Sequence, residues 1–361
     1  MIEIKKDSVE LTLESNVVYD LPFLWLRDNC QCDECRITET EEKQFLLHTV
    51  PSDIRPKSVE EKNDNLIIHW PDSHKSIIPI KKILRSSSQR YPKKESWPED
   101  FKPQKYDWNQ FLELDSLAIN GLQDFVRYGV IILKNAPDES NSLELLAKRF
   151  GPIHETLFER IHNVSVTGQV YNVAHTSKGL PPHNDFASYL YQPNVQALHM
   201  LVNECEGGES VIVDGWEAAK DLKNKNPDFF EILSNFDVPF REFDDNNETY
   251  AEAPLIRCSP SGEIESFRFS NQLMQMINPI KKNVKKFYDA YHKLSEMMHS
   301  SKYRSKFRLN SGEVLIVASL RVLHARESFI PNGKRHLQDA YFFMIMLQII
   351  LLDYLNIKIL W

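Results

Sequence analysis

The stretch Leu180-Pro181-Pro182-His183-Asn184-Asp185-Phe186 decides how this chain folds. His183 and Asp185 stand two residues apart, so they lie on the same face of a strand or of the turn that leaves it. No other histidine of the chain has an acid two residues after it. With a second, distant histidine, the pair would form the facial triad that binds ferrous iron and leaves positions open for oxygen and substrate.

The candidate for the second histidine is His324, which lies 141 residues downstream and just after the apolar run 314–318. A jelly roll can unite such distant segments because its first and last strands pair across a sheet. Arg335 follows eleven residues later and can grip a carboxylate with two parallel hydrogen bonds. Taken singly, His324 fits a core histidine and Arg335 a solvated surface arginine. Together and in this order, His183, Asp185, His324 and Arg335 favour a binding site for a 2-oxo acid. Two oxygens of the acid would bind iron and its far carboxylate would bind Arg335.

Short apolar segments separated by long inserts support this fold class. We expect strands at 130–133, 195–202, 211–213 and 314–318, and helices at 117–128, 143–150, 217–235 and 284–298. The fold class predicted is mainly β with helical inserts: a double-stranded β-helix (jelly roll) preceded by a small β domain.

The small domain carries a second cluster of metal-binding residue types. Cys30-Gln31-Cys32-Asp33-Glu34-Cys35 places three thiols within six residues, and His74 follows in a strand-like region. Three cysteines and one histidine form a closed tetrahedral zinc site, which stabilises structure and performs no chemistry. The alternative interpretation is a set of reduced, buried cytosolic thiols.

These features divide the chain into four parts. Residues 1–85 are expected to form the zinc-binding β domain, 86–105 a linker rich in Ser, Lys and Pro, and 106–345 the jelly-roll domain. Residues 346–361 are an atypical apolar tail.

Composition excludes several classes of protein. The formal charge of −8 argues against nucleic acid as a partner. Five cysteines, three of them clustered, do not make an even-numbered disulfide framework. The charged start has no apolar region typical of a secretory signal, and the long apolar stretch at 341–352 is too short to span a bilayer. We therefore expect a cytoplasmic protein that does not enter a membrane.

Three segments resemble the γ-butyrobetaine and trimethyllysine dioxygenases: 25–30, which ends at Cys30, 70–74, which ends at His74, and Gly207-Gly208-Glu209-Ser210-Val211-Ile212-Val213-Asp214-Gly215. The resemblance implies iron(II)- and 2-oxoglutarate-dependent hydroxylation of a small amine-bearing carboxylate, as in carnitine biosynthesis. It implies Fe(II), Zn(II), 2-oxoglutarate and O₂ as cofactors and cosubstrates, and a homodimer. It further implies that Ser210 helps to hold 2-oxoglutarate and that Asn172 and Asn271 contact the substrate.

The chain departs from the family at the aromatic cage that holds a trimethylammonium group by cation–π attraction. The matching positions are Phe158, His162, His175 and Tyr341. His162 stands in place of a tryptophan and His175 in place of a tyrosine. Ala318-Ser319-Leu320 also stands where the family has Asp-Asn-Trp. The same chemistry on a different small substrate is therefore an alternative, and a non-catalytic jelly-roll binding protein is another.

Overall fold

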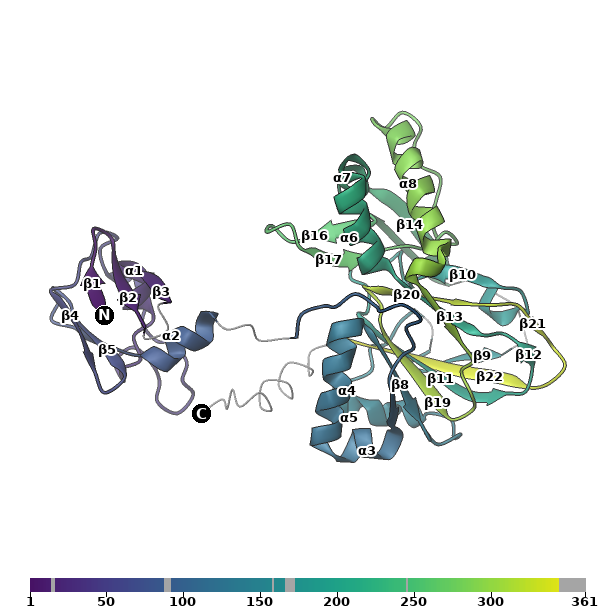
Figure 1. The fold of residues 1–361 in the computed structure, drawn as a ribbon, viewed down its shortest axis with the longest axis horizontal. Helices are drawn as coiled ribbons and strands as arrows, with labels where there is room; N and C mark the ends of the chain where they lie inside the picture. Colours follow the sequence, from purple (N-terminus) through teal and green to yellow (C-terminus); the bar gives the residue numbers. More distant parts are fainter. Residues whose placement is uncertain (14–16, 88–91, 158, 166–172, 245, 344–361) are drawn as a thin grey trace. The chain divides into compact units, whose positions relative to one another are not determined.

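The computed structural model describes residues 1–13, 17–87, 92–157, 159–165, 173–244 and 246–343 (Figure 1). The chain forms two compact units, whose described parts are residues 1–87 and 92–343. The apolar tail predicted at 346–361 lies outside the described residues. Among the helices of the described segments, none combines the length and apolar character needed to cross a membrane.

The first unit contains two small antiparallel sheets. One joins β1 (Ile2–Ile4), β2 (Ser8–Thr12) and β3 (Val18–Pro22), and the other joins β4 (Ser58–Lys62), β5 (Asn65–His69) and β6 (Lys75–Pro79). Helix α1 (Phe23–Asp28) follows β3, and α2 (Ile80–Ser87) follows β6. Alternate residues of β2 and β6 are buried, so each of these strands turns one side toward a shared core built around Leu26, Leu66, Ile68 and Trp70.

The second unit has two sheets that face each other, as predicted for a jelly roll. The larger has the order β7 (Lys105–Asp107), β8 (Val130–Lys134), β19 (Glu313–Ala318), β11 (Val195–Asn203), β22 (Arg335–Phe342) and β9 (His162–Ser165). The smaller has the order β10 (Leu180–His183), β20 (Val322–Arg326), β13 (Ser210–Asp214) and β18 (Arg304–Phe307).

The central strands are apolar at almost every position because both of their faces are covered. In β8, Ile131 and Leu133 pack under helices, whereas Val130 and Ile132 point into the core between the two sheets. The helices on the outer face are α3 (Trp108–Glu113), α4 (Asp115–Tyr128) and α5 (Ala147–Phe150) (Figure 1). The inner face therefore remains available for a site.

The helices largely agree with the sequence, with two local differences. Helix α4 ends at the predicted Gly129, whose φ of 77° is left-handed. The helix expected at 143–150 instead begins as a 3₁₀ turn at Ser142–Leu146 and becomes α-helical only at α5. The insert expected at 217–235 divides into α6 (Gly215–Lys225) and α7 (Pro227–Asn235), because Pro227 lacks an N–H to continue the first helix.

Helices α6, α7 and α8 (Val284–His299) pack together over one end of the smaller sheet, beside two hairpins (Figure 1). These elements are β14 (Val238–Phe243) with β15 (Glu248–Ala253), and β16 (Ile256–Cys258) with β17 (Ile264–Phe267). A further short pair, β12 (Glu206–Gly207) with β21 (Phe329–Ile330), lies near the chain reversal before β22.

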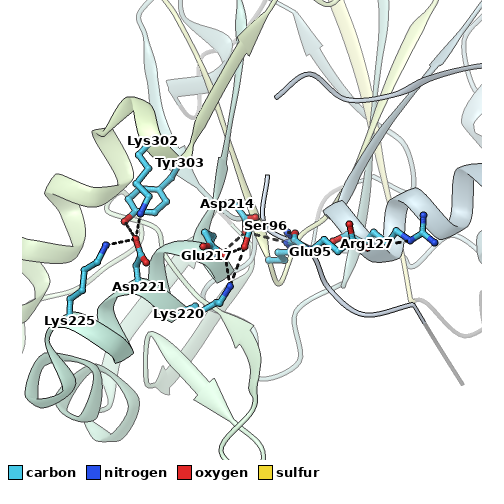
Figure 2. Close-up of polar contacts among 11 residues, drawn as sticks. Glu95, Ser96, Arg127, Asp214, Glu217, Lys220, Asp221, Lys225, Lys302 and Tyr303 are labelled. Atoms are coloured by element: carbon cyan, nitrogen blue, oxygen red, sulfur yellow. Dashed lines mark hydrogen bonds and ion pairs between the residues drawn. The ribbon is translucent and has the colours of Figure 1, made fainter. Parts of the chain in front are cut away.

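Part of the segment predicted as a linker packs onto the second unit. Residues 92–104 contain no helix or strand, yet Phe101 is buried between the sheets and Trp97 stacks on it at 4.5 Å. Figure 2 shows Ser96 beside Glu217 and Lys220 of α6, where its hydroxyl donates to Glu217 Oε2 at 2.6 Å.

A buried ion pair fixes this region to the strand that carries His324. Nη2 of Arg321 lies 2.6 Å from Asp214 Oδ2, and both side chains are at most 5% exposed. The same guanidinium donates to the carbonyl oxygens of Arg127 and Glu95. The carboxylate of Asp214 also accepts from the N–H of Glu217 at the start of α6 (Figure 2).

Asp214→Ala should therefore lower the free energy of unfolding of the second unit by about 3–5 kcal/mol, because it leaves a buried guanidinium without its counter-ion. Urea unfolding followed by circular dichroism measures this change. Glu248→Ala is the matched control, since it removes an exposed carboxylate from its pair with Arg241 and should leave the midpoint nearly unchanged. Equal effects of the two changes would contradict the assignment.

Candidate active site and metal centres

The structure brings the three predicted iron ligands together on the smaller sheet. β10 pairs antiparallel with β20, and in this register His183 lies opposite His324. The two imidazole rings are 4.2 Å apart between centroids. Asp185, in the turn after β10, reaches back so that its carboxylate oxygens lie 3.3 Å from Nε2 of His183 and 3.7 Å from Nε2 of His324. One ligand atom from each residue thus faces a common point.

Neighbouring groups orient these side chains. Nδ1 of His183 donates to the carbonyl oxygen of Pro181 at 2.9 Å, which leaves Nε2 as the ligand atom. Oδ2 of Asp185 accepts from Nε2 of Gln196 and from the hydroxyl of Tyr341, each at 2.7 Å. Gln196 and Tyr341 lie opposite each other in the pairing of β11 with β22. The carboxylate is therefore fixed from the larger sheet.

Two of the three ionisable groups are shifted toward the form that binds a metal. The third differs, because against the effect of burial Asp185 raises the pKa of His183, so a metal would displace the proton of this imidazole. Burial disfavours the charge of Asp185, but the nearby imidazoles outweigh it and lower the pKa of this carboxyl. Burial, together with the charge of His183, lowers the pKa of His324 to about 4. Asp185 thus stays ionised and His324 stays neutral, which are the forms that bind a metal.

Asn184, between the two ligands, holds the turn in place. Its side-chain N–H groups donate to the carbonyl oxygens of Phe267 and Ser319, and its Oδ1 accepts from the N–H of Phe269 at 2.8 Å. Ser319 belongs to the Ala-Ser-Leu stretch that departs from the family pattern, and it supports the turn through its backbone. The next residue, Phe186, has a positive φ of 53°, which is strained for an aromatic residue.

A cavity of about 360 Å³ opens beside the triad. Strand β22 contributes every second residue to its wall, as the alternation of a strand requires: Arg335, Leu337, Asp339 and Tyr341. From the smaller sheet come His183, His324, Arg326 and Ser210. The predicted iron ligands, Arg335, Ser210, His162 and Tyr341 therefore line one cavity.

Arg335 is a half-buried cation, and no residue that the structure describes supplies it with an anion. Its guanidinium has no hydrogen bond or ion pair among the residues that the structure describes, and its buried Nε lacks a partner. Burial lowers the pKa of this group, so its charge is costly without a counter-ion. Arg326, by contrast, donates to the carbonyl oxygens of Ala174, Thr176 and Lys178. Of these two arginines, only Arg335 has its planar fork available for a carboxylate.

Of the residues predicted to contact the substrate, some line the cavity and others do not. His162 lines the cavity, and its Nδ1 lies 3.3 Å from Asp339, whose charge raises the pKa of the imidazole against the effect of burial. His175 is buried behind it, with the two rings in an edge-to-face arrangement at 5.7 Å. Asn271 does not line the cavity and accepts from the hydroxyl of Tyr291 at 3.3 Å. Phe158 and Asn172 lie outside the described residues.

Three polar residues of the site were not found from the sequence: Gln196, Asp339 and Glu242. Asp339 accepts from Tyr341 at 2.9 Å and lies next to His162. Glu242, on β14, faces the cavity from the side of the hairpins. The alternation between Arg335 and Tyr341 could have identified Asp339, because all three share one face of the strand.

The triad fits ferrous iron by its donor chemistry. Two imidazole nitrogens and one carboxylate oxygen lie within 4.8 Å of one another, on one side of a partly apolar cavity. Two histidines and one carboxylate with open positions are the donor set of non-haem iron oxygenases. The guanidinium of Arg335, in the same cavity, is a group of the kind that binds carboxylates.

The first unit carries the second metal-binding group. Nε2 of His74 lies 3.4 Å from the sulfur of Cys30, 3.7 Å from that of Cys32 and 3.5 Å from that of Cys35. A tetrahedron built on zinc–ligand bonds of about 2.0–2.3 Å has edges of roughly 3.5–3.8 Å. The four donors therefore surround a point at zinc-binding distance.

Polar neighbours support this cluster. Nδ1 of His74 lies 3.2 Å from the carboxylate of Glu34, and Arg27 donates to the sulfur of Cys35 at 3.4 Å. Burial raises the pKa of the Cys35 thiol to about 12. Burial also opposes ionisation of Cys30, but hydrogen bonds, the largest from Ser76, outweigh it and lower its pKa to about 6. The distances among the four donor atoms, and not these shifts, make the set fit zinc better than a group of inert thiols.

Comparisons with known proteins find matches to both units of the chain. A family model described as taurine catabolism dioxygenase TauD, TfdA family matches residues 93–341, and one described as gamma-butyrobetaine hydroxylase-like, N-terminal, matches residues 2–79. Gamma-butyrobetaine dioxygenase of Pseudomonas sp. (strain AK-1) is 31% identical over 334 residues, which cover 89% of this chain and 87% of that protein. The Homo sapiens gamma-butyrobetaine dioxygenase is 28% identical over 340 residues, with the same coverage. The mitochondrial trimethyllysine dioxygenase of Bos taurus is 28% identical over 354 residues, covering 93% and 83%.

The Cys₃His cluster leads to a direct prediction. The purified protein should contain about one zinc ion per chain bound in this unit, and Cys32→Ser should lose it and expose residues 1–87 to proteolysis, since structural zinc supplies folding free energy. Metal analysis and limited proteolysis measure the two effects. Cys258→Ser, at a half-buried cysteine of β16, is the control and should keep its zinc. A folded, protease-resistant Cys32→Ser protein would contradict a structural zinc site.

Proposed function

The chain belongs to the taurine catabolism dioxygenase TauD, TfdA family, and from this premise we propose that it is an iron(II)- and 2-oxoglutarate-dependent hydroxylase of a small amine-bearing carboxylate. The observation that carries the proposal is that Arg335 shares one cavity with His183, Asp185 and His324. Its half-buried guanidinium has no anion partner among the described residues. A site for iron alone would have no need of this cation. The dioxygenases to which the chain is similar act, by their names, on γ-butyrobetaine and trimethyllysine.

Each residue has a distinct part in the proposed reaction. His183, Asp185 and His324 would hold the iron, and Gln196 with Tyr341 would keep the carboxylate of Asp185 in place. Arg335 would bind the far carboxylate of 2-oxoglutarate, with Ser210 beside it in the cavity wall. When bound, iron supplies the oxidation, in which dioxygen is consumed, 2-oxoglutarate becomes succinate and CO₂, and a C–H bond of the substrate becomes C–OH.

The apolar wall supports the same function. Val164, Leu198, Leu315 and Leu337 line the cavity and limit the water that can reach the reacting atoms. Exclusion of water strengthens the electrostatic interactions of the site and suppresses side reactions. The cytoplasmic location and the homodimer expected from the sequence stay predictions.

The presence of all three iron-ligand residues, His183, Asp185 and His324, together with Arg335, argues against a non-catalytic binding protein. Oxygen consumption by the full-length protein, with iron and 2-oxoglutarate added, tests the proposal, and succinate release over a panel of amine-bearing carboxylates identifies the substrate. We expect consumption that requires both additions. A protein that binds 2-oxoglutarate but consumes no oxygen with any substrate would favour the binding function.

The iron ligands lead to a second prediction. Asp185→Ala and His324→Ala should each reduce 2-oxoglutarate turnover to below about 1% of the wild-type value, because two remaining ligands do not define the required geometry. His292→Ala, at an exposed histidine of α8, is the control and should turn over normally. Turnover well above background in either ligand variant, with unchanged iron content, would show that the ligands are misassigned.

A third prediction concerns Arg335. Arg335→Lys should raise the concentration of 2-oxoglutarate needed for half-maximal turnover by about tenfold or more, since lysine keeps the charge but loses the planar fork. Arg241→Lys, at an exposed arginine, serves as control. An unchanged requirement in Arg335→Lys would contradict the assignment of the carboxylate site to Arg335.

A further inference from the structure

Strand β14 brings a carboxylate into the substrate cavity. Phe240 and Glu242 share one face of this strand because they stand two residues apart, and Phe240 is 1% exposed. Arg241, on the opposite face, forms an ion pair with Glu248 on the outside of the hairpin at 2.8 Å. Glu242 therefore points inward, where it lines the same cavity as the triad.

The hairpin is fixed to another part of the cavity wall. The N–H of Arg241 donates to the carbonyl oxygen of Leu273 at 2.9 Å, and Phe240 forms a bridge with Met274. Leu273 lines the cavity together with Ser270 and Gln272. Glu242 thus stands on a packed strand, so its position relative to the cavity is set by backbone hydrogen bonds.

Glu242 differs from the other acids of the cavity because none of the described residues donates a hydrogen bond to its carboxylate. Asp185 accepts from Gln196 and Tyr341, and Asp339 accepts from Tyr341 and lies next to His162. The buried Oε2 of Glu242 has no hydrogen-bond partner among the described residues. Burial, and then the charge of Asp185, raises the pKa of this carboxyl to about 7. A carboxylate buried without a donor is unstable unless a ligand supplies one.

The cage positions determine which ligand would suit. A trimethylammonium group has no N–H and is held by aromatic ring faces. Here His162 lies beside Asp339, which raises the pKa of its imidazole, and His175 lies behind it. Neither form of imidazole replaces the ring face of tryptophan or tyrosine. Repulsion by an imidazolium would act on any cation, so it is the loss of ring faces that disfavours a trimethylammonium. Phe186 and Tyr341 still give the cavity two aromatic rings, but among the described residues it adds a carboxylate, that of Glu242, to which no residue donates.

We propose that Glu242 binds the cationic group of the substrate, and that this group is an ammonium that carries N–H bonds rather than a trimethylammonium. This inference rests on the proposed function, because it names the substrate class of the same cavity. The carboxylate of Glu242 accepts hydrogen bonds from the ammonium, and the two charges neutralise each other in the interior. Selectivity then follows from the number of N–H bonds and not from ring contacts.

A methylation series tests the inference on the unmodified protein. Isothermal titration calorimetry, without oxygen and with iron and 2-oxoglutarate present, would compare 4-aminobutanoate with its N-methyl, N,N-dimethyl and N,N,N-trimethyl forms. Lysine and Nε-trimethyllysine form a second matched pair. We expect affinity to fall by about tenfold or more when the last N–H is lost, as for a charge-assisted hydrogen bond. A trimethyl form that binds as tightly as its N–H analogue, or no binding by any member of either series, would overturn the proposal.

Glu242→Gln provides the second arm, since it removes the charge and keeps the size of the side chain. It should weaken binding of the N–H amines by about tenfold or more and leave the trimethyl forms much less affected. Glu252→Gln, at the carboxylate of β15 that pairs with Lys281, is the matched control and should bind every amine as the wild type does. Equal weakening across the series, or no weakening, contradicts the role of Glu242. Circular dichroism verifies folding, and if Glu242→Gln does not fold, the methylation series decides.

The two proposals fail in different ways. If the protein is not a hydroxylase, oxygen consumption is absent with every amine, whatever the calorimetry shows. If Glu242 is not the amine site, the calorimetric difference between N–H and trimethyl forms is absent, while 2-oxoglutarate-dependent oxygen consumption remains.

Discussion

The antiparallel pairing of β10 with β20 is the constraint on which the site depends. It places His183 opposite His324 although 141 residues separate them, and the turn after β10 then returns Asp185 to the same point. The buried ion pair of Arg321 with Asp214 joins the start of β20 to the neighbouring β13, and Asn184 joins the turn after β10 to Ser319. Most of the second unit thus supports the relative position of three side chains.

The interior of the jelly roll contains charges that the protein does not neutralise by itself. Among the described residues, Arg335 has no anion and the buried oxygen of Glu242 has no donor, whereas Asp185 and Asp339 have partners. Buried charges of this kind persist where a ligand completes them, because the free energy of an unpaired ion in the interior is otherwise unfavourable. The guanidinium of Arg335 suits an anionic cosubstrate, and the carboxylate of Glu242 suits a cationic substrate.

The sequence predicted the residues whose spacing itself carries the chemistry. The His-x-Asp pair, the distant His324 and the Cys₃His set follow from such spacings, and Gly129 as a helix end follows from its backbone freedom. Asp339, Gln196 and Glu242 were missed because each lies on an ordinary strand, and only the register of the sheets reveals which face points to the cavity. The packing of Trp97 and Phe101 could not be predicted, because the lysines and prolines around them are typical of a linker.

The proposed function requires two metal centres of different chemistry, one closed and one open to the cavity. Anomalous X-ray scattering from crystals of the full-length protein, measured at the iron and zinc absorption edges, tests this most directly. We expect an iron peak within bonding distance of Nε2 of His183, the carboxylate of Asp185 and Nε2 of His324. We expect a zinc peak among the side chains of Cys30, Cys32, Cys35 and His74. Iron bound elsewhere, or zinc filling the triad of iron-loaded protein with all positions closed, would contradict it.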